Sequence, residues 1–278
     1  MKFFINFFPL VVLNCLFLQN ACTGVPGKME AGGSLEGTVQ GLVLYQLVTE
    51  EESIPLYPDR KDRSPRMTLQ FTLLDASGSP AQRRFFRDVL YQGNNPEEYK
   101  EKILRSYERE YFKMRPAVAR YEDFPQESLN WFYVETMETE AISSRGAVVR
   151  RSREYYTGGA HGMRNTEYFV LDLKSAERFS LEDIISPGSE PALKAEVAAA
   201  LRDFSNLKAG EPLSQGYYFE DTVAPSRNFF LNSRGLGFHW DPYEIAPYAT
   251  GSIEIVIPYN RITQFLNVRT LSLIEDLN

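Results

Sequence analysis

Runs of alternating apolar and polar residues constrain the fold of this chain most. Within Met67–Leu74, apolar side chains occupy every second position from Met67 to Leu73, with Thr or Gln between them. Ile253, Ile255 and Ile257 repeat this pattern near the end of the chain. Period-two alternation is typical of a strand with one buried face. Short connections between such runs indicate antiparallel pairing.

Further segments have the same strand-like character and are bounded by turn residues. Together with Met67–Leu74, the predicted strands are Leu42–Val48, Asn130–Ile142, Ala147–Tyr156, Arg164–Leu173, Asn228–Leu231, Leu236–Trp240 and Ser252–Ile257. The charged segment Pro58–Pro65 lies between the predicted strands Leu42–Val48 and Met67–Leu74 and is predicted to be a loop.

One helix is predicted to begin at Asn95. Asn95 is a good N-cap, Pro96 suits the first helical position, and Glu98 completes a capping box. Its apolar face and its outward ion pairs recur at helical spacing. These are Tyr99, Ile103, Tyr107, Tyr111 and Met114 on one face, and the pairs Glu98/Lys102 and Glu101/Arg105 on the other, with Pro116 predicted to end the helix.

A second helix is predicted from Glu190 to Phe204, with Leu193, Val197, Leu201 and Phe204 on one face. Amphipathic helices need a sheet to cover. The sequence therefore predicts an α+β fold, in which a mostly antiparallel sheet is packed by two main amphipathic helices.

The N-terminus has the pattern of a secretory signal. Lys2 is followed by an apolar run, and Ala21 is a small residue directly before Cys22. Cys15 falls within the segment that cleavage removes, so Cys22 is the one cysteine of the mature chain and calls for an explanation. Lipid attachment to Cys22 provides one, although Gln19 stands where such signals usually have Leu. Ordinary signal cleavage and an uncleaved anchor are the alternatives.

The predicted organisation is a lipoprotein signal peptide (1–21), a flexible glycine-rich tether (22–34) and an envelope domain (35–278). The envelope domain is long enough for one large domain or two intimate subdomains. The formal net charge of −7 argues against nucleic acid as a general partner and is compatible with a basic protein partner. The prediction is an exported protein, anchored to a membrane of the cell envelope by lipid on Cys22.

Gly158, Gly159, His161 and Gly162 form the first candidate binding segment. They join two predicted strands, so the plain interpretation is a hairpin connection whose glycines adopt positive φ angles. Such a turn also lets a ligand approach the backbone closely, and His161 could serve as an acid, a base or a ligand to a metal. No second histidine lies nearby and no zinc-binding spacing is present. We therefore predict neither a metal nor a cofactor.

Trp240, Asp241, Tyr243, Glu244 and Tyr248 form the second candidate binding segment. Two prolines stiffen the loop that follows the strand. Tyr and Trp on a rigid backbone offer large contact area to a sugar or a protein at low entropic cost. The alternative is a loop packed over the core, with the tyrosine hydroxyls bonded to backbone.

Several arginines gather around the first of these segments: Arg145, Arg150, Arg151, Arg153 and Arg164. On a strand, Arg151 and Arg153 face opposite to Arg150, so these arginines do not form one clean patch. We predict a solvated, salt-bridged surface.

Gly158–Gly162 and Asp241–Tyr248, continued to Ile257-Pro258-Tyr259, resemble a bacterial envelope domain of unknown function. That domain forms the C-terminus of the anti-sigma factor RsiV and the non-catalytic N-terminal region of the peptidoglycan deacetylase PdaC. The resemblance covers about Gly37 to Phe265. It implies an antiparallel sheet packed by helices, and in the anti-sigma factor this domain binds lysozyme.

The sequence departs from both proteins in the parts that signal or catalyse. Only Met1 and Lys2 precede the apolar run, so we expect no cytoplasmic segment for a sigma factor. Two histidines in total do not provide a deacetylase metal site. The leading hypothesis is a non-enzymatic binding protein whose target is peptidoglycan or a lysozyme-like muramidase. The alternatives are a structural or assembly lipoprotein that binds another envelope protein, and an envelope hydrolase using His161 with Asp241 or Glu244.

Overall fold

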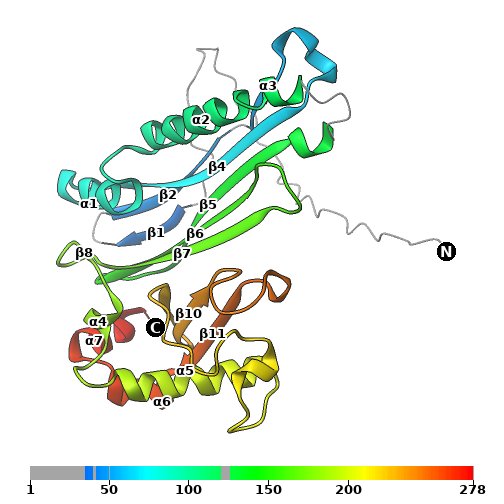
Figure 1. Ribbon diagram of the computed structural model, residues 1–278. Helices are drawn as coiled ribbons and strands as arrows, with labels where there is room; N and C mark the ends of the chain where they lie inside the picture. The colour runs from blue at the N-terminus through cyan, green and yellow to red at the C-terminus, as the bar shows by residue number, and fades with distance from the viewer. Residues whose placement is uncertain (1–34, 40–41, 50, 120–125, 278) are drawn as a thin grey trace, which may run out of the picture.

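The computed structural model describes residues 35–39, 42–49, 51–119 and 126–277 (Figure 1). The predicted signal peptide, the tether and Cys22 lie outside these residues. Within them, two sheets and several helices confirm the α+β class, and most neighbouring strands are antiparallel.

The larger sheet pairs its strands in the order β1-β2-β4-β5-β6-β7-β8, and β3 pairs with β4 beside the end of β2. Its strands are β1 (Leu35–Val39), β2 (Leu42–Val48), β3 (Glu52–Pro55), β4 (Arg66–Ser77), β5 (Trp131–Ile142), β6 (Gly146–Tyr156), β7 (Met163–Asp172) and β8 (Glu177–Arg178). The strands predicted for this part of the chain are all present. Their alternation of buried and less buried residues is the pattern that identified them in the sequence.

One neighbouring pair in this sheet, β4 and β5, is parallel, with Met67 opposite Trp131. A parallel pair needs a long crossover connection, usually helical. Here the crossover contains α1 (Pro80–Tyr91), α2 (Pro96–Phe112) and α3 (Arg115–Val118). Figure 1 shows α1 and α2 lying across one face of the sheet. The other neighbouring strands of this sheet are antiparallel, as their short connections predicted.

The start of α2 confirms the predicted capping box. The Asn95 side chain accepts a hydrogen bond from the Glu98 amide (2.8 Å), and the Glu98 carboxylate accepts one from the Asn95 amide (3.1 Å). Because Glu98 is used in this way, it does not form the predicted pair with Lys102, whose ammonium donates to Asn94 instead. The helix ends at Phe112, and Pro116 lies within α3 rather than ending α2.

Besides the two predicted helices, the described chain has two other helices of ten residues or more that were not predicted. The first, α1, begins with a capping box of Ser79 and Gln82 and buries Phe86, Leu90 and Tyr91. The second, α7 (Val268–Leu277), ends the described chain. No helix in the described ranges is long and apolar enough to span a membrane.

The smaller sheet pairs β9 (Phe229–Asn232), β10 (Gly235–Trp240) and β11 (Ile253–Pro258) in antiparallel order β11-β10-β9. The predicted second helix is confirmed as α5 (Glu190–Phe204), which packs against β11. Its residues Leu193, Val197 and Leu201 are buried, whereas Phe204 is 47% exposed and does not share that buried face. The remaining helices are α4 (Leu181–Ile184), α6 (Tyr259–Ile262), and the short 3-10 turns Pro58–Arg63, Gln126–Leu129, Leu213–Gly216, Tyr248–Thr250 and Thr263–Phe265.

Two hydrophobic cores lie on opposite faces of the larger sheet. Val149 and Phe169 face the core beneath α1 and α2. Val148 and Val170, one position away on the same strands, face the core shared with β9–β11 and α5. The central strands β6 and β7 are thus buried on both faces near one end. Figure 1 shows the resulting layers: helices, large sheet, small sheet and helices.

Candidate functional site

His239 lies at the centre of a polar cluster between the two sheets. It is 4% exposed, on β10, directly opposite Glu254 of β11. Its Nδ1 lies 3.2 Å from Glu254 Oε2, and its Nε2 lies 3.1 Å from Asp241 Oδ1. An imidazole that contacts carboxylates through both nitrogens donates from both when it is protonated. The cluster therefore favours a charged histidine.

The pKa values of the three groups agree with this geometry. Burial lowers the pKa of His239, but hydrogen bonds to Asp241 and Glu254 outweigh burial and raise that pKa to about 9. Burial raises the pKa of Asp241, but hydrogen bonds, the strongest from His239, outweigh it and lower that pKa. The hydrogen bond from His239 is the largest cause of the lowered pKa of Glu254. His239 is thus a cation held between two anions.

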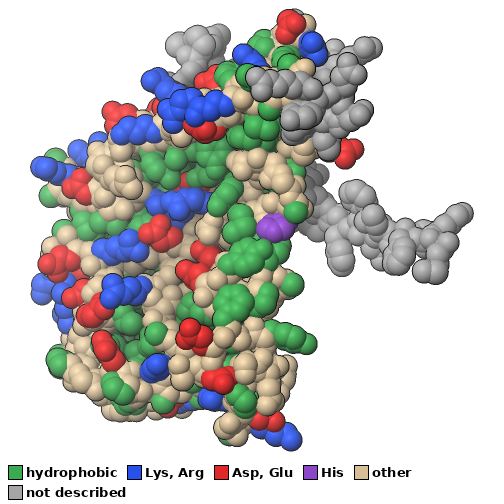
Figure 2. Space-filling model, viewed as in Figure 1, with side chains coloured by type: hydrophobic (Ala, Val, Ile, Leu, Met, Phe, Trp, Pro, Cys, Tyr) green, Lys and Arg blue, Asp and Glu red, His purple; other side chains and the backbone are tan. Residues whose placement is uncertain are grey.

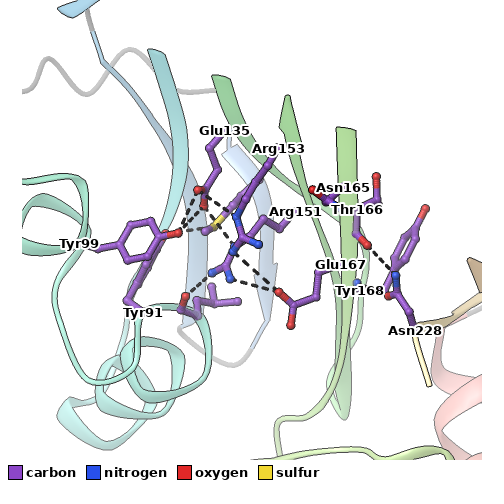
Figure 3. A network of polar contacts seen from close by, with 12 residues as sticks. Tyr91, Tyr99, Glu135, Arg151, Arg153, Asn165, Thr166, Glu167, Tyr168 and Asn228 are labelled. Carbon is purple, nitrogen blue, oxygen red and sulfur yellow. Dashed lines mark hydrogen bonds and ion pairs between the residues drawn. The ribbon is translucent and has the colours of Figure 1, made fainter. Parts of the chain in front are cut away.

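Asp241 also covers the outer edge of β7. Its Oδ1 accepts a hydrogen bond from the Thr166 amide (2.9 Å), and its Oδ2 accepts one from the Asn165 side chain (3.1 Å). Asn228 acts similarly, accepting from the Tyr168 amide and donating to the Thr166 carbonyl (Figure 3). Exposed strand edges invite unwanted pairing. The side chains of Asp241 and Asn228 thus form hydrogen bonds with backbone groups on the edge of β7, at positions that β8 does not reach.

An aromatic stack lies on the surface where the two predicted binding segments meet. The ring centroids of His161 and Tyr248 are 3.8 Å apart, and those of Tyr248 and Tyr243 are 5.5 Å apart. The Tyr248 hydroxyl donates to the Gly162 carbonyl (2.8 Å), which fixes the stack to the β6–β7 connection. Figure 2 shows hydrophobic side chains gathered around an exposed histidine on this face. We call His161, Tyr248 and Tyr243 the aromatic stack.

The glycine turn supplies the backbone for this arrangement. Gly158 and Gly159 have φ angles of 92° and 97°, which other residues rarely adopt. Gly162 has no positive φ angle but approaches the Tyr155 carbonyl so closely that a Cβ would lie 3.0 Å from it. The turn therefore has the conformation expected of a hairpin connection, and it also presents His161 to solvent.

The second candidate segment divides into exposed and buried parts. Trp240 is 4% exposed and packs beside Phe238, so its ring is not on the surface. Glu244 accepts a hydrogen bond from the Asp241 amide (2.7 Å), which shapes the loop. Tyr243 is 53% exposed and has a φ angle of 74°. Positive φ is unusual for a bulky residue and is a reason to consider function.

The residues proposed for hydrolysis make different contacts. The ring of His161 contacts Tyr248 and the Gly162 carbonyl. Asp241 contacts the other histidine, His239, which the sequence analysis did not include as a site residue. Among the described residues there is no group of three or more His, Cys, Asp or Glu side chains placed to hold a metal ion.

A second polar network lies under α1 and α2, on the opposite face of the larger sheet (Figure 3). Glu135 is fully buried, with Oε1 3.2 Å from Arg151 Nε and Oε2 3.3 Å from Arg153 Nε. Tyr99 and Tyr133 donate hydrogen bonds to the same carboxylate. Buried charges must be paired in this way, because an unpaired one is costly.

This network corrects the prediction of a solvated arginine surface. Arg151 is 5% exposed, and one end of its guanidinium donates to the Leu90 carbonyl of α1. Arg150 faces the other side, as the alternation predicted, and pairs with Glu138 and Glu140. The sequence identified the two faces but not the helices that bury one of them.

A cleft of about 530 Å³ adjoins His239 on the face of the larger sheet opposite α1 and α2. Its lining comes from β5, β6 and β7 on one side and from the β10–β11 hairpin on the other. The lining residues are Val134, Thr136, Glu138, Arg150, Ser152, Arg153, Glu154, Arg164, Thr166, Tyr168, His239, Ser252 and Glu254. Its size is within the range of small-ligand sites.

Comparisons with known proteins place this fold in context. Residues 182–260 match the family described as "Protein of unknown function (DUF3298)". That segment runs from α4 through β11 and carries His239, Asp241, Tyr243, Tyr248 and Glu254. No curated protein with significant similarity was found.

Two solved structures described as members of the DUF3298 family share the fold. One, from Bacteroides fragilis, has a TM-score of 0.74 at 23% identity, covering 88% of this chain and 99% of its own. The other, from Pseudomonas aeruginosa, has a TM-score of 0.54 at 20% identity, covering 85% of this chain and 98% of its own. Neither description mentions an anti-sigma factor or a deacetylase, so the narrower resemblance to those two proteins stays a prediction.

Proposed function

We propose that this chain is a non-enzymatic binding protein of the bacterial cell envelope, with a basic, lysozyme-like muramidase as its ligand. Lipid on Cys22 holds it at a membrane, and the aromatic stack makes the central contacts with the ligand. The observation that carries the proposal is the stack of exposed His161, half-buried Tyr248 and exposed Tyr243, fixed to the glycine turn by a hydrogen bond.

The surroundings of the stack support a protein ligand. The Phe219 amide donates to the Ile245 carbonyl, which brings another exposed aromatic segment beside the loop. In that segment, Tyr217 is 78% exposed and Phe219 is 55% exposed. Exposed aromatic residues on fixed backbone are typical of the centres of protein interfaces.

Charge supports a basic ligand. The formal net charge of the whole chain is −7, with 37 acidic and 30 basic residues. Complementary charge raises the rate of association and favours the correct partner. Lysozyme-like muramidases are the basic partners that the sequence resemblance implies.

The polar cluster supports binding rather than hydrolysis. A carboxylic acid that protonates a leaving group needs a raised pKa. The pKa values of Asp241 and Glu254 are both lowered, because each carboxylate pairs with His239. This cluster braces the two sheets and supports the loop that carries Tyr243.

In the test, the full-length chain is purified in detergent and immobilised. Its capture of a C-type lysozyme and of purified peptidoglycan sacculi is then measured at low salt. Tyr243→Ala should weaken lysozyme binding by about 2 kcal/mol, or roughly thirtyfold, as for a central interface tyrosine. Tyr45→Ala is the matched control, since Tyr45 lies on β2 near the other edge of the sheet and bonds to Asp75.

Each outcome of the capture decides something. Lysozyme binding that Tyr243→Ala leaves unchanged contradicts the assignment to the aromatic stack. Binding to sacculi alone replaces the muramidase with peptidoglycan as the ligand, and binding to neither refutes the proposal. Fractionation tests the anchor separately: Cys22→Ser should move the protein from the membrane to the soluble fraction.

A further inference from the structure

The cleft beside His239 has a floor made by three adjacent strands in register. Thr136 of β5 is opposite Ser152 of β6, and Ser152 is opposite Thr166 of β7. All three line the cleft, so their hydroxyls form a row across its floor. Ser252, beside β11, adds a fourth hydroxyl from the facing wall.

These hydroxyls are available to a ligand. Within the described part of the chain, the side chains of Thr136, Ser152, Thr166 and Ser252 make no hydrogen bond. Thr166 is 9% exposed as a residue and lines the cleft, and its hydroxyl is not one of the buried side-chain atoms that lack a partner. A hydroxyl both donates and accepts, so this row suits a ligand that does the same.

Charged residues flank the hydroxyl row but are already paired. On one side, Arg164 lies 2.6 Å from Glu154. On the other side, Arg150 pairs with Glu138 and Glu140. On the wall, Glu254 accepts a hydrogen bond from the Tyr168 hydroxyl and pairs with His239. Figure 2 shows positive and negative side chains interspersed over this view of the molecule. Such a lining does not select a strongly anionic or cationic ligand.

Aromatic rings continue the same face of the sheet beyond the charged row. Phe132 and Tyr156, opposite each other on β5 and β6, are stacked with centroids 6.3 Å apart. Gly162 lies beside Phe132, since a Cβ on it would be 3.7 Å from that ring. This aromatic pair lies on the same face of the sheet as the hydroxyl row, beyond the lining of the cleft, and suits an extended ligand that has both apolar ring faces and many hydroxyl groups.

We propose that this cleft binds a neutral oligosaccharide, with the Thr136-Ser152-Thr166 row bonding its hydroxyl groups and the Phe132–Tyr156 pair contacting a ring face. This site is distinct from the aromatic stack, to which the proposed function assigns a protein ligand. It does not depend on that assignment, because none of the hydroxyl row belongs to the stack.

In the test, the full-length protein in detergent is titrated with a tetramer of β-1,4-linked N-acetylglucosamine, and the heat of binding is measured by isothermal titration calorimetry. We expect saturable binding of one tetramer per chain. Ser152→Leu places an apolar side chain in the middle of the floor and should weaken binding at least about tenfold, since it both fills the cleft and leaves ligand hydroxyls unpaired. Ser77→Leu is the matched control, because Ser77 is an exposed strand serine that does not line the cleft.

Several results would overturn the proposal: no binding of the tetramer, equal binding by Ser152→Leu and wild type, or tighter binding of a tetramer of galacturonic acid, which is anionic. If Ser152→Leu does not fold, Ser252→Leu on the facing wall makes the same prediction. Tyr243→Ala should bind the tetramer as wild type does. A wild-type protein that binds the tetramer but does not capture lysozyme would refute the proposed function alone, and one that captures lysozyme but does not bind the tetramer would refute only the saccharide site.

Discussion

Raising the pH from 6.5 to about 9.5 should lower the unfolding free energy by about 3 kcal/mol through His239. The pKa of His239 is raised from 6.5 to about 9 in the folded protein. A group with a higher pKa in the folded state stabilises it fully below its ordinary pKa. That stabilisation is lost as the pH rises through the folded value. Each pH unit between the two values corresponds to about 1.36 kcal/mol, so a difference of roughly 2.5 units gives the stated magnitude.

The groups around His239 do not titrate in this range. Asp241 and Glu254 have lowered pKa values and stay ionised. Tyr168, whose ring lies 6.0 Å from that of His239, has a pKa raised first by burial and then by Glu254, so it keeps its proton. Arg150 of β6 also lowers the pKa of Glu254. Burial lowers the pKa of Arg150 itself, but Glu138 and Glu140 outweigh burial and raise it. The loss of stability therefore belongs to His239.

Urea unfolding at a series of pH values, followed by the fluorescence of the buried Trp131 and Trp240, measures this dependence. His239→Gln should be less stable than wild type at pH 6.5, and the difference should nearly vanish by about pH 9.5. His161→Gln is the control, because it removes the other histidine, which contacts Tyr248 rather than two carboxylates. A wild-type protein whose stability is constant across this range would refute the reasoning, as would His239→Gln with an unchanged slope.

Three further substitutions test the fold. Arg151→Met removes a partner of the fully buried Glu135 and should lower the free energy of unfolding by about 3 kcal/mol, as urea unfolding can measure. This is the lower end for a broken buried pair, because Arg153 Nε remains 3.3 Å from Glu135 Oε2. Gly237→Ala puts a Cβ 2.1 Å from the Phe230 ring and should lower stability by about 1–3 kcal/mol, seen as a lower Tm. Asn95→Ala removes the cap of α2 and should cost about 1 kcal/mol by the same unfolding assay.

Elements whose signals are local could be predicted from the sequence. β2 has the predicted bounds, Leu42–Val48, and α5 has the predicted bounds, Glu190–Phe204. The capping box at Asn95 could be identified because both partners lie within four residues of each other. Alternation also assigned Arg150 and Arg151 to opposite faces of β6. Each of these depends on neighbours along the chain.

The helix α1 had a local signal that the sequence analysis did not use. Ser79, Pro80 and Gln82 form the same kind of start as Asn95, Pro96 and Glu98. With the helix already predicted from Asn95, it would have given a long helical connection between β4 and β5, which is what a parallel pair requires.

The site depended on contacts between distant segments, which alternation cannot reveal. His239 and Glu254 are neighbours only because β10 and β11 pair in one particular register. Trp240 was correctly predicted at the end of a strand, but it was also a candidate binding residue, and its side chain is buried in the core. Arg151 is buried because α1 and α2 cover its face of the sheet, and the sequence prediction lacked α1.

Adjacent residues of β6 show how the two faces of the larger sheet differ in what they can do. Arg151 points under the helices, where it neutralises Glu135 and contacts α1, so no ligand reaches it. Ser152 points into the cleft, where the smaller sheet leaves the opposite face partly uncovered. Substitution of Arg151 should therefore change the free energy of unfolding, whereas substitution of Ser152 should change ligand affinity. If Ser152→Leu altered stability as much as Arg151→Met and left affinity unchanged, both faces would be structural, and the cleft would have no role in binding.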